Sequence, residues 1–236
     1  MVMGAGGDDM PLRAARYERK FLVEDLAPAQ VAALVRLHPR LFYAPYPPRY
    51  VNNLYLDTAD MEHYYDNVHG AAQRRKVRLR WYGGLWGQIE RPVLEIKIKD
   101  GYVGTKRSHA LPGFCLAPGF GDGALQRLLA AADLPGAVGC ELRCLHLVLL
   151  NRYHRRYYAS RDGGFRLTLD TELTYYRANG GPGNRFVHRQ ASARQVIVEL
   201  KYGLDREPEA HRVAGYFPFR MTRSSKYVQG VERVYG

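Results

Sequence analysis

The sequence predicts an α+β protein built around a closed antiparallel β-barrel, or tunnel, of about eight strands, with helices packed outside. Three observations support this fold class. Several segments alternate charged and apolar residues, which is the period of a β-strand. Turn signals such as Asp100–Gly101 join consecutive segments into hairpins, so neighbouring strands run antiparallel. The chain has 236 residues, a length typical of one large barrel, and no shift in composition divides it.

Charge alternation is clearest in Gln73–Tyr82, where every second residue from position 74 to position 80 is basic and the residues between are apolar from position 77 on. Similar alternation recurs in Arg16–Val23, Pro92–Lys99 and Gln195–Tyr202. Four such strands predict either four solvated faces or one shared charged interior. We favour the shared interior, because if all four charged faces were solvated, the apolar faces of all four strands would have to pack into one core.

The remaining elements follow in chain order. Further strands are expected at Tyr50–Leu56, Tyr102–Leu111, Leu145–Ser160, Phe165–Asp170, Leu173–Arg177 and Arg185–Arg189. Helices or helical turns are expected at Ala27–Leu37, Asp60–Asn67, Ala124–Asp133, Pro208–Tyr216 and from Ser224 or Ser225 to Val231. The segment Pro112–Gly123 is expected to be a loop. Residues 1–13 are expected to be disordered, and residues 14–236 to form a single domain.

The charge balance favours an anionic partner. Lysine and arginine number 35 against 23 acidic residues, which gives a net charge of +12. Nucleic acid, anionic lipid, nucleotide and polyphosphate all satisfy this criterion. Three cysteines are too few for a disulfide framework and lack zinc-site spacing, which indicates reduced thiols in a cytoplasmic protein. No run of about 18 apolar residues exists, so attachment to the inner face of a membrane would need a partner protein.

A charged interior needs counter-charge, because burying like charges alone costs several kcal/mol each, on the order of the penalty for any unpaired buried ion. Arginine binds phosphate oxygens as a fork, and lysine acts as a compact point charge. Inward glutamates can hold Mg²⁺ or Mn²⁺, which also bridges phosphate oxygens. The residues therefore predict an enclosed site for a polyanion and a divalent metal.

An ordered series of motifs resembles the VTC domain, the polyphosphate polymerase domain within the triphosphate tunnel metalloenzyme superfamily. The motifs span nearly the whole chain. They are Arg16–Lys20, Asn53–Asp57, Val77–Tyr82, Leu94–Lys97, Gly104–Lys106, Tyr153–Arg155, Phe165–Asp170, Val198–Tyr202 and Ser225–Tyr227.

The resemblance implies a phosphotransferase that passes the γ-phosphate of ATP to a growing inorganic polyphosphate chain, with Mn²⁺ or Mg²⁺. Its matching positions give each site residue an expected role. The reaction is assigned to Arg78, Arg80, Lys97 and Lys226, substrate binding to Lys20, Lys106, Arg155, Arg166 and Lys201, and metal binding to Glu199 with Glu18 and Glu95 as further ligands. Asp170 is open to a structural or a functional role.

One position departs from the wider superfamily pattern. Many tunnel enzymes begin with Glu-x-Glu-x-Lys, and here Arg16 replaces the first glutamate, which fits VTC domains better than triphosphate hydrolases. The change puts a second tightly bound metal in doubt. A metal-dependent triphosphatase or short-chain polyphosphatase, and a non-catalytic polyphosphate-binding module, remain alternatives. Nucleic acid is not expected as a partner, because it needs an exposed groove. VTC proteins of fungi carry membrane helices that this sequence lacks, which leaves room for a membrane-protein partner.

Overall fold

The computed structural model describes residues 16–101, 103–179, 186, 189–192 and 194–236. The expected disordered segment 1–13 and most of the expected strand Arg185–Arg189 lie outside these residues. Within the described ranges, no helix combines the length and the apolar composition needed to cross a membrane. The three cysteines are exposed free thiols.

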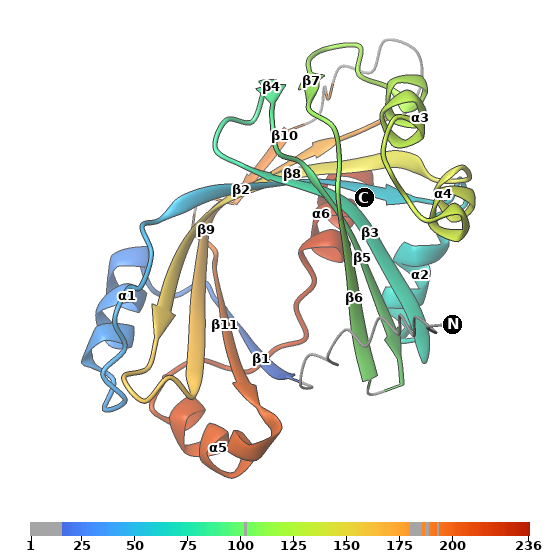
Figure 1. Cartoon of the computed structure of the whole chain (residues 1–236). Helices are drawn as coiled ribbons and strands as arrows, with labels where there is room; N and C mark the ends of the chain where they lie inside the picture. The colour runs from blue at the N-terminus through green and yellow to red at the C-terminus, as the bar shows by residue number, and fades with distance from the viewer. Residues whose placement is uncertain (1–15, 102, 180–185, 187–188, 193) are drawn as a thin grey trace, which may run out of the picture.

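The main sheet is antiparallel and curls into a half-barrel (Figure 1). Its eight strands follow one another in the order β1-β11-β9-β8-β2-β3-β5-β6, and a ninth strand, β10, pairs with β9. Their bounds are β1 Arg16–Val23, β2 Arg49–Asp57, β3 Gln73–Tyr82, β5 Val93–Asp100, β6 Val103–Ala110, β8 His146–Ala159, β9 Phe165–Arg177, β10 Arg189–Ser192 and β11 Val196–Gly203. The predicted α+β antiparallel fold is confirmed. The two edge strands, β1 and β6, form no ladder with each other among the described residues, so the curl is a half-barrel rather than a closed ring.

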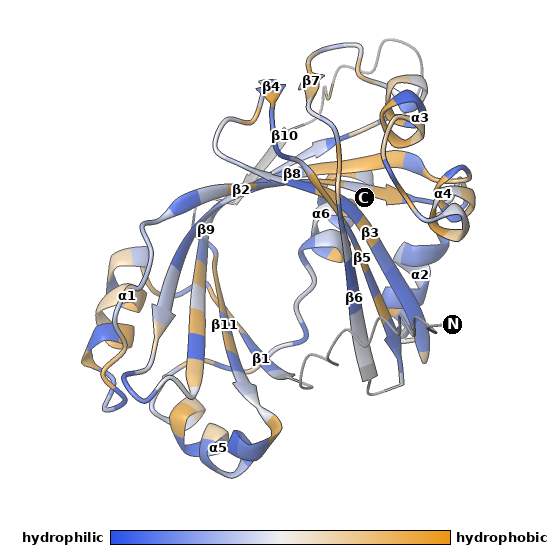
Figure 2. Cartoon of the chain, in the orientation of Figure 1, coloured by the Kyte–Doolittle hydropathy of each residue, from blue (hydrophilic) through white to orange (hydrophobic). Residues whose placement is uncertain are grey.

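The convex face of the sheet carries the apolar rows that the alternation predicts. Val77, Leu79 and Trp81 of β3 are buried in a cluster with residues of α3 and α4, and a second cluster joins β1, β9 and β11 to α1 and α5. Figure 2 shows the hydrophobic end of β8 lying beside a hydrophobic α4. These helices are α1 Pro28–Leu37, α3 Asp122–Ala130, α4 Gly136–Leu142 and α5 Glu207–Gly215.

Two features lie where no element was expected. The helix α4 fills the stretch before β8, and part of the expected loop Pro112–Gly123 forms strand β7, Phe114–Leu116, which pairs with β4, Gly87–Ile89. Both pack on the convex cluster through residues such as Val138 and Ile89. Short elements of this kind depend on tertiary contacts that local periodicity does not report.

The last helix, α6 Lys226–Tyr235, packs on the concave side of the sheet rather than outside it (Figure 1). Its buried residues join Tyr55, Leu149 and Tyr175 in an apolar cluster, and α2, Glu62–His69, covers its outer flank. Contact is so close that a Cβ atom at Gly230 would lie 2.4 Å from Leu149 Cδ2. The Ser225 hydroxyl caps the helix by accepting a bond from the Val228 amide at 3.4 Å.

Strand β9 is continuous where two strands were expected, and it contains one extra residue. Arg152 pairs with Thr174, whereas His154 pairs with Thr171, so β8 advances by two residues while β9 advances by three. The extra residue is accommodated at Glu172, whose φ is 54°. As a result β9 turns Asp170 and then Leu173 to the concave side, and the lining changes from ionic to apolar at this point.

Candidate functional site

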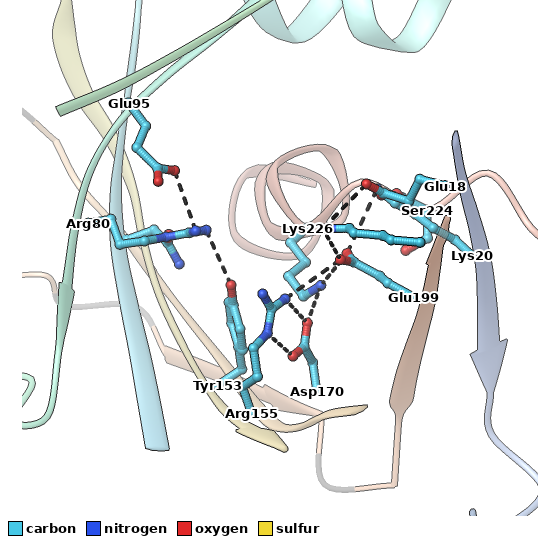
Figure 3. A network of polar contacts seen from close by, with 12 residues as sticks. Glu18, Lys20, Arg80, Glu95, Tyr153, Arg155, Asp170, Glu199, Ser224 and Lys226 are labelled. Carbon is cyan, nitrogen blue, oxygen red and sulfur yellow. Dashed lines mark hydrogen bonds and ion pairs between the residues drawn. The ribbon is translucent and has the colours of Figure 1, made fainter. Parts of the chain in front are cut away.

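A buried quartet of charges, Arg155, Asp170, Glu199 and Lys226, forms one wall of the concave face (Figure 3). Arg155 donates from Nε and Nη2 to the two carboxylate oxygens of Asp170, both at 2.6 Å. Lys226 Nζ lies 2.6 Å from Asp170 Oδ2 and 3.2 Å from Glu199 Oε1. Strands β8, β9 and β11 and the first turn of α6 thus supply one side chain each to one ion-pair network.

Mutual pairing keeps the quartet charged. Burial alone would raise the pKa of Glu199, but Lys226 and Lys20 hold it well below the usual carboxylate range. Burial would also raise the pKa of Asp170, but Arg155 and Lys226 lower it. The pKa of Lys226 is raised, because Asp170 and Glu199 outweigh the cost of burial. All four groups therefore stay ionised over the neutral pH range.

Glu18 and Glu199 lie side by side between two lysines. In the β1–β11 ladder Lys20 is opposite Glu199 and Glu18 is opposite Lys201, so the four side chains share one face. Lys20 Nζ lies 2.9 Å from Glu18 Oε1 and 3.9 Å from Glu199 Oε1, while Lys201 Nζ lies 3.5 Å and 3.4 Å from the other oxygens of the same carboxylates. Lys20 also donates to the Ser224 carbonyl at 3.1 Å, which ties it to the segment before α6.

Glu95 stands on the opposite wall, away from Glu18 and Glu199, and is held by cations (Figure 3). It accepts from Arg78 Nη2 at 2.6 Å, lies 3.4 Å from Arg80 Nη1, and pairs with Lys106. Burial would raise the pKa of Glu95, but Arg78 and Arg80 lower it to about 2. This carboxylate therefore orients arginines, and it belongs to no group of three or more described His, Cys, Asp or Glu side chains that could hold a metal.

Tyr153 connects the two walls. Arg80 Nη2 donates to its hydroxyl at 3.4 Å, and the guanidinium of Arg155 lies 5.2 Å from its ring centroid. Although burial would raise the pKa of Tyr153, Arg155 and Arg80 lower it. Neither Tyr153 nor Asp170 was assigned a site role from the sequence. Both share a strand face with a predicted residue, since Tyr153 lies two before Arg155 and Asp170 lies four after Arg166, and that spacing was the available signal.

Several cations have no carboxylate partner among the described residues. Lys97 has no ion pair. Its pKa is lowered by desolvation and by nearby Lys20 and Lys201, and these effects outweigh the opposite effect of Glu18 and Glu199. Lys76 donates to the Ser225 hydroxyl at 2.9 Å and has a pKa of about 7, lowered by burial and then by neighbouring cations. Arg166 is exposed, opposite Lys201 in the ladder. These three groups are available to an anion.

The structure thus brings the predicted residues together on two walls. Lys20, Arg155, Lys201, Lys226, Glu18 and Glu199 lie on one, and Arg78, Arg80, Glu95 and Lys106 lie on the other, with Lys97 opposite Lys106 and Arg166 opposite Lys201 in the ladders. Their roles in binding and reaction remain predictions.

The fit of a divalent metal depends on Glu18 and Glu199. No cluster of three or more His, Cys, Asp or Glu side chains in the described ranges is arranged as a complete metal site. Mg²⁺, however, is bound in many proteins by one or two carboxylates completed by substrate phosphates and water. Thr168, opposite Glu199 in the ladder, has a buried hydroxyl with no hydrogen-bond partner. This oxygen-rich pair fits a metal that arrives with its phosphate ligand.

Comparison with known proteins identifies the fold and the family. No functionally curated protein matches the chain. A candidate adenylate cyclase from Vibrio parahaemolyticus shares its fold, with a TM-score of 0.50, 13% identity and coverage of 91% of this chain and 97% of that one. A second, from Bacillus halodurans, has a TM-score of 0.50, 14% identity and coverage of 90% and 94%. The family model for the VTC domain matches residues 15–235. The chain therefore belongs to the VTC domain family.

Proposed function

We propose that this protein is a polyphosphate polymerase, which transfers the γ-phosphoryl group of ATP to the end of an inorganic polyphosphate chain. One observation carries the proposal: all seven lysines of the chain lie on the concave face. They are Lys20, Lys76, Lys97, Lys99, Lys106, Lys201 and Lys226. Surface cations elsewhere are arginines. A lysine ammonium is a compact, strongly hydrated charge, suited to a mobile row of phosphates, whereas arginine is the stronger fixed fork.

Each wall has a separate task in this proposal. Arg78 and Arg80 are fixed by Glu95 and Asn53, so their remaining N–H groups present a preset fork to phosphate oxygens. Lys97 and Lys76, which lack carboxylate partners, follow the chain of phosphates along the face. Lys226 is fixed by Asp170 and Glu199 and marks the reacting end. Positioning and charge neutralisation are what phosphoryl transfer chiefly requires.

The transfer step balances without an added reactant. A terminal phosphate oxygen of the acceptor chain bonds to the γ-phosphorus, and the bond from that phosphorus to the β–γ bridging oxygen breaks. The electron pair stays on ADP, and no net proton is moved. Charge that builds on the bridging oxygen faces the nearby cations. Glu18 and Glu199 would hold Mg²⁺ or Mn²⁺, which supplies neutralisation of phosphate charge when bound.

The state of the carboxylates favours a phosphate acceptor over water. Hydrolysis needs a group that takes a proton from water, and a useful base has a pKa near the working pH. Here Glu199, Asp170 and Glu95 all have pKa values that neighbouring cations lower, so none of them is a base near neutral pH. A polyphosphate oxygen is already ionised and needs no base. This supports the polymerase over the triphosphatase alternative.

Incubation of the purified protein with ATP and Mn²⁺ tests the proposal. Long-chain polyphosphate and ADP should form in step, and Lys226→Met should lower the rate by about 100-fold or more, since it removes a fixed charge at the reacting bond. Arg212→Met, an exposed cation on α5, is the matched control and should leave the rate unchanged. Orthophosphate as the dominant product would favour a hydrolase, and tight polyphosphate binding without turnover would favour a binding module.

A further inference from the structure

A cluster of aromatic rings around one arginine lies at one end of the concave face. The guanidinium carbon of Arg49 lies 3.8 Å from the ring centroid of Tyr82 and 5.2 Å from that of Tyr157. Arg49 Nε also donates to the Tyr157 hydroxyl at 3.0 Å. The ring of Tyr46 meets Tyr157 edge-on, with centroids 6.0 Å apart. We name these four residues the mouth cluster. No phosphate contact has been assigned to any of them.

The mouth cluster continues the walls of the phosphate site. Tyr82 follows Arg80 by two residues and Tyr157 follows Arg155 by two, so each shares a strand face with its neighbour. Arg49 is the ladder partner of Arg155. The guanidinium of Arg155 lies 6.0 Å from the Tyr157 ring, which places the cluster next to the buried quartet.

The rings are accessible. Tyr82 is 45% exposed and Tyr46 is 66% exposed, and Arg49 is also exposed. A purely structural cluster would bury its aromatic faces, because ring burial is the main source of their stabilisation. The mouth cluster instead leaves planar surfaces open to solvent beside a site for phosphates.

The other end of the face has a different chemistry. Along β3 and β5 the concave positions there are all basic, namely Arg74, Lys76, Lys97 and Lys99. One end therefore offers flat π surfaces and a guanidinium plane, and the other offers a row of cations along β3 and β5. A nucleoside triphosphate has the same asymmetry, with a flat base at one end and a chain of phosphates at the other.

We propose that the mouth cluster binds the purine base of the donor nucleotide, which stacks on Tyr82 and the Arg49 plane while the phosphates extend past Arg80 and Arg155. This inference rests on the proposed nucleotide-using function and deepens it. Stacking on aromatic and guanidinium planes is strong and does not discriminate among bases of equal size, because every base has a π face. The site should therefore bind ATP and GTP alike, and both more tightly than CTP or UTP.

Binding measurements with two ligands test the inference. Affinities for inorganic tripolyphosphate and for an ATP analogue with a non-hydrolysable β–γ bridge are compared in wild type, Tyr82→Ala and Arg49→Ala. The analogue should bind about tenfold or more weakly to each variant, while tripolyphosphate binding stays within about twofold, because only the analogue carries a base. Tyr65→Ala, an exposed tyrosine on α2, is the matched control and should change neither affinity.

A second pair of variants guards against misfolding. Tyr82→Phe keeps the ring and should retain wild-type analogue affinity. Tyr157→Phe removes the hydroxyl that holds Arg49, so it should weaken binding of the analogue and leave tripolyphosphate binding unchanged. Equal losses for both ligands, or unchanged analogue binding in Tyr82→Ala, would overturn the inference. The readout is binding without turnover. If the protein makes no polymer, the proposed polymerase is wrong. The affinities measured here decide base stacking independently of that result.

Discussion

Asp170 on β9 and Lys226 on α6 are joined by a 2.6 Å ion pair in which the carboxylate is completely buried. The same carboxylate receives the fork of Arg155. One acid thus fixes two cations that come from different elements, and it ties the last helix to the sheet. Removal of such a partner leaves buried charge without compensation.

Asp170→Asn should therefore lower the free energy of unfolding by about 3–5 kcal/mol. The amide keeps the shape of the side chain but cannot neutralise Arg155 and Lys226. Urea denaturation at neutral pH gives the measurement. Asp205→Asn, at a side chain that is 78% exposed, is the matched control and should change stability by less than about 0.5 kcal/mol. A loss below about 1 kcal/mol in Asp170→Asn would show that the quartet is not a stabilising unit.

Glu18 and Glu199, rather than Glu95, should control metal binding. Titration of Mn²⁺ in the presence of tripolyphosphate should show affinity reduced by tenfold or more, on the order of the loss known for metal-site changes, in Glu18→Gln and Glu199→Gln. Glu95→Gln should retain metal affinity and weaken phosphate binding instead, because Glu95 orients Arg78 and Arg80. Loss of metal affinity in Glu95→Gln alone would contradict this division.

Gly230→Ala should dislodge α6. The new methyl group would collide with Leu149 and Tyr175, so we expect a loss of about 1–3 kcal/mol from overpacking, together with reduced polymer formation as Lys226 moves. Gly139→Ala on α4 is the control, since nothing lies within 4 Å of the new atom. There alanine should be neutral or stabilising by up to about 1 kcal/mol, because it favours the helix. Equal thermal stability of the two variants would rule out tight packing at Gly230.

Lys76 should make anion binding depend on pH. Its pKa of about 7 means that a bound anion, which favours the ammonium, must draw in a proton above neutral pH. Affinity for tripolyphosphate should therefore fall as pH rises from about 7 to about 9, and Lys76→Met should flatten the part of the profile that this residue causes. The ratio of wild-type to variant affinity cancels the titration of the ligand itself. A constant ratio across this range would exclude Lys76 as the titrating group.

The same residue affects stability with the opposite trend. The unfolded chain holds the Lys76 proton up to its ordinary pKa of 10.5, whereas the folded chain releases it near 7. Between these values the unfolded state binds more protons, so the contribution of Lys76 to the free energy of unfolding rises with pH. Below about pH 7 the penalty is complete, and Lys76→Met should there be more stable than wild type.

Much of one wall could be predicted from the sequence, because strand geometry alone determines which side chains share a face. Alternation in Gln73–Tyr82 and Pro92–Lys99 was enough to place Arg78, Arg80 and Glu95 together, and the ladder between β3 and β5 confirms that grouping. Whether Glu95 binds a metal or arginines depends on its distances to side chains of neighbouring strands. These distances depend on the register between the strands, which a local sequence pattern does not determine.

The position of α6 could not be predicted from its sequence. Its capping serine and helical spacing identify a helix, but an amphipathic helix can cover either face of a sheet. Gly230, which permits close approach to β8 and β9, reads in the sequence as an ordinary glycine. The quartet around Asp170 was hidden for the same reason, since Lys226 reaches β9 only when α6 is on the concave side.

The extra residue at Glu172 acts as a change of phase within β9. Up to Asp170 the even-numbered residues line the concave side, and from Leu173 onward the odd-numbered ones do. Without the extra residue, Leu173 and Tyr175 would point to the convex side, and α6 would lose the apolar surface on which it packs. The position of the backbone bulge therefore determines where the concave face changes from ionic to apolar. A bulge at another position of β9 would change the lengths of both parts. A longer ionic part would leave a shorter apolar surface for α6, and a shorter ionic part would leave a longer one.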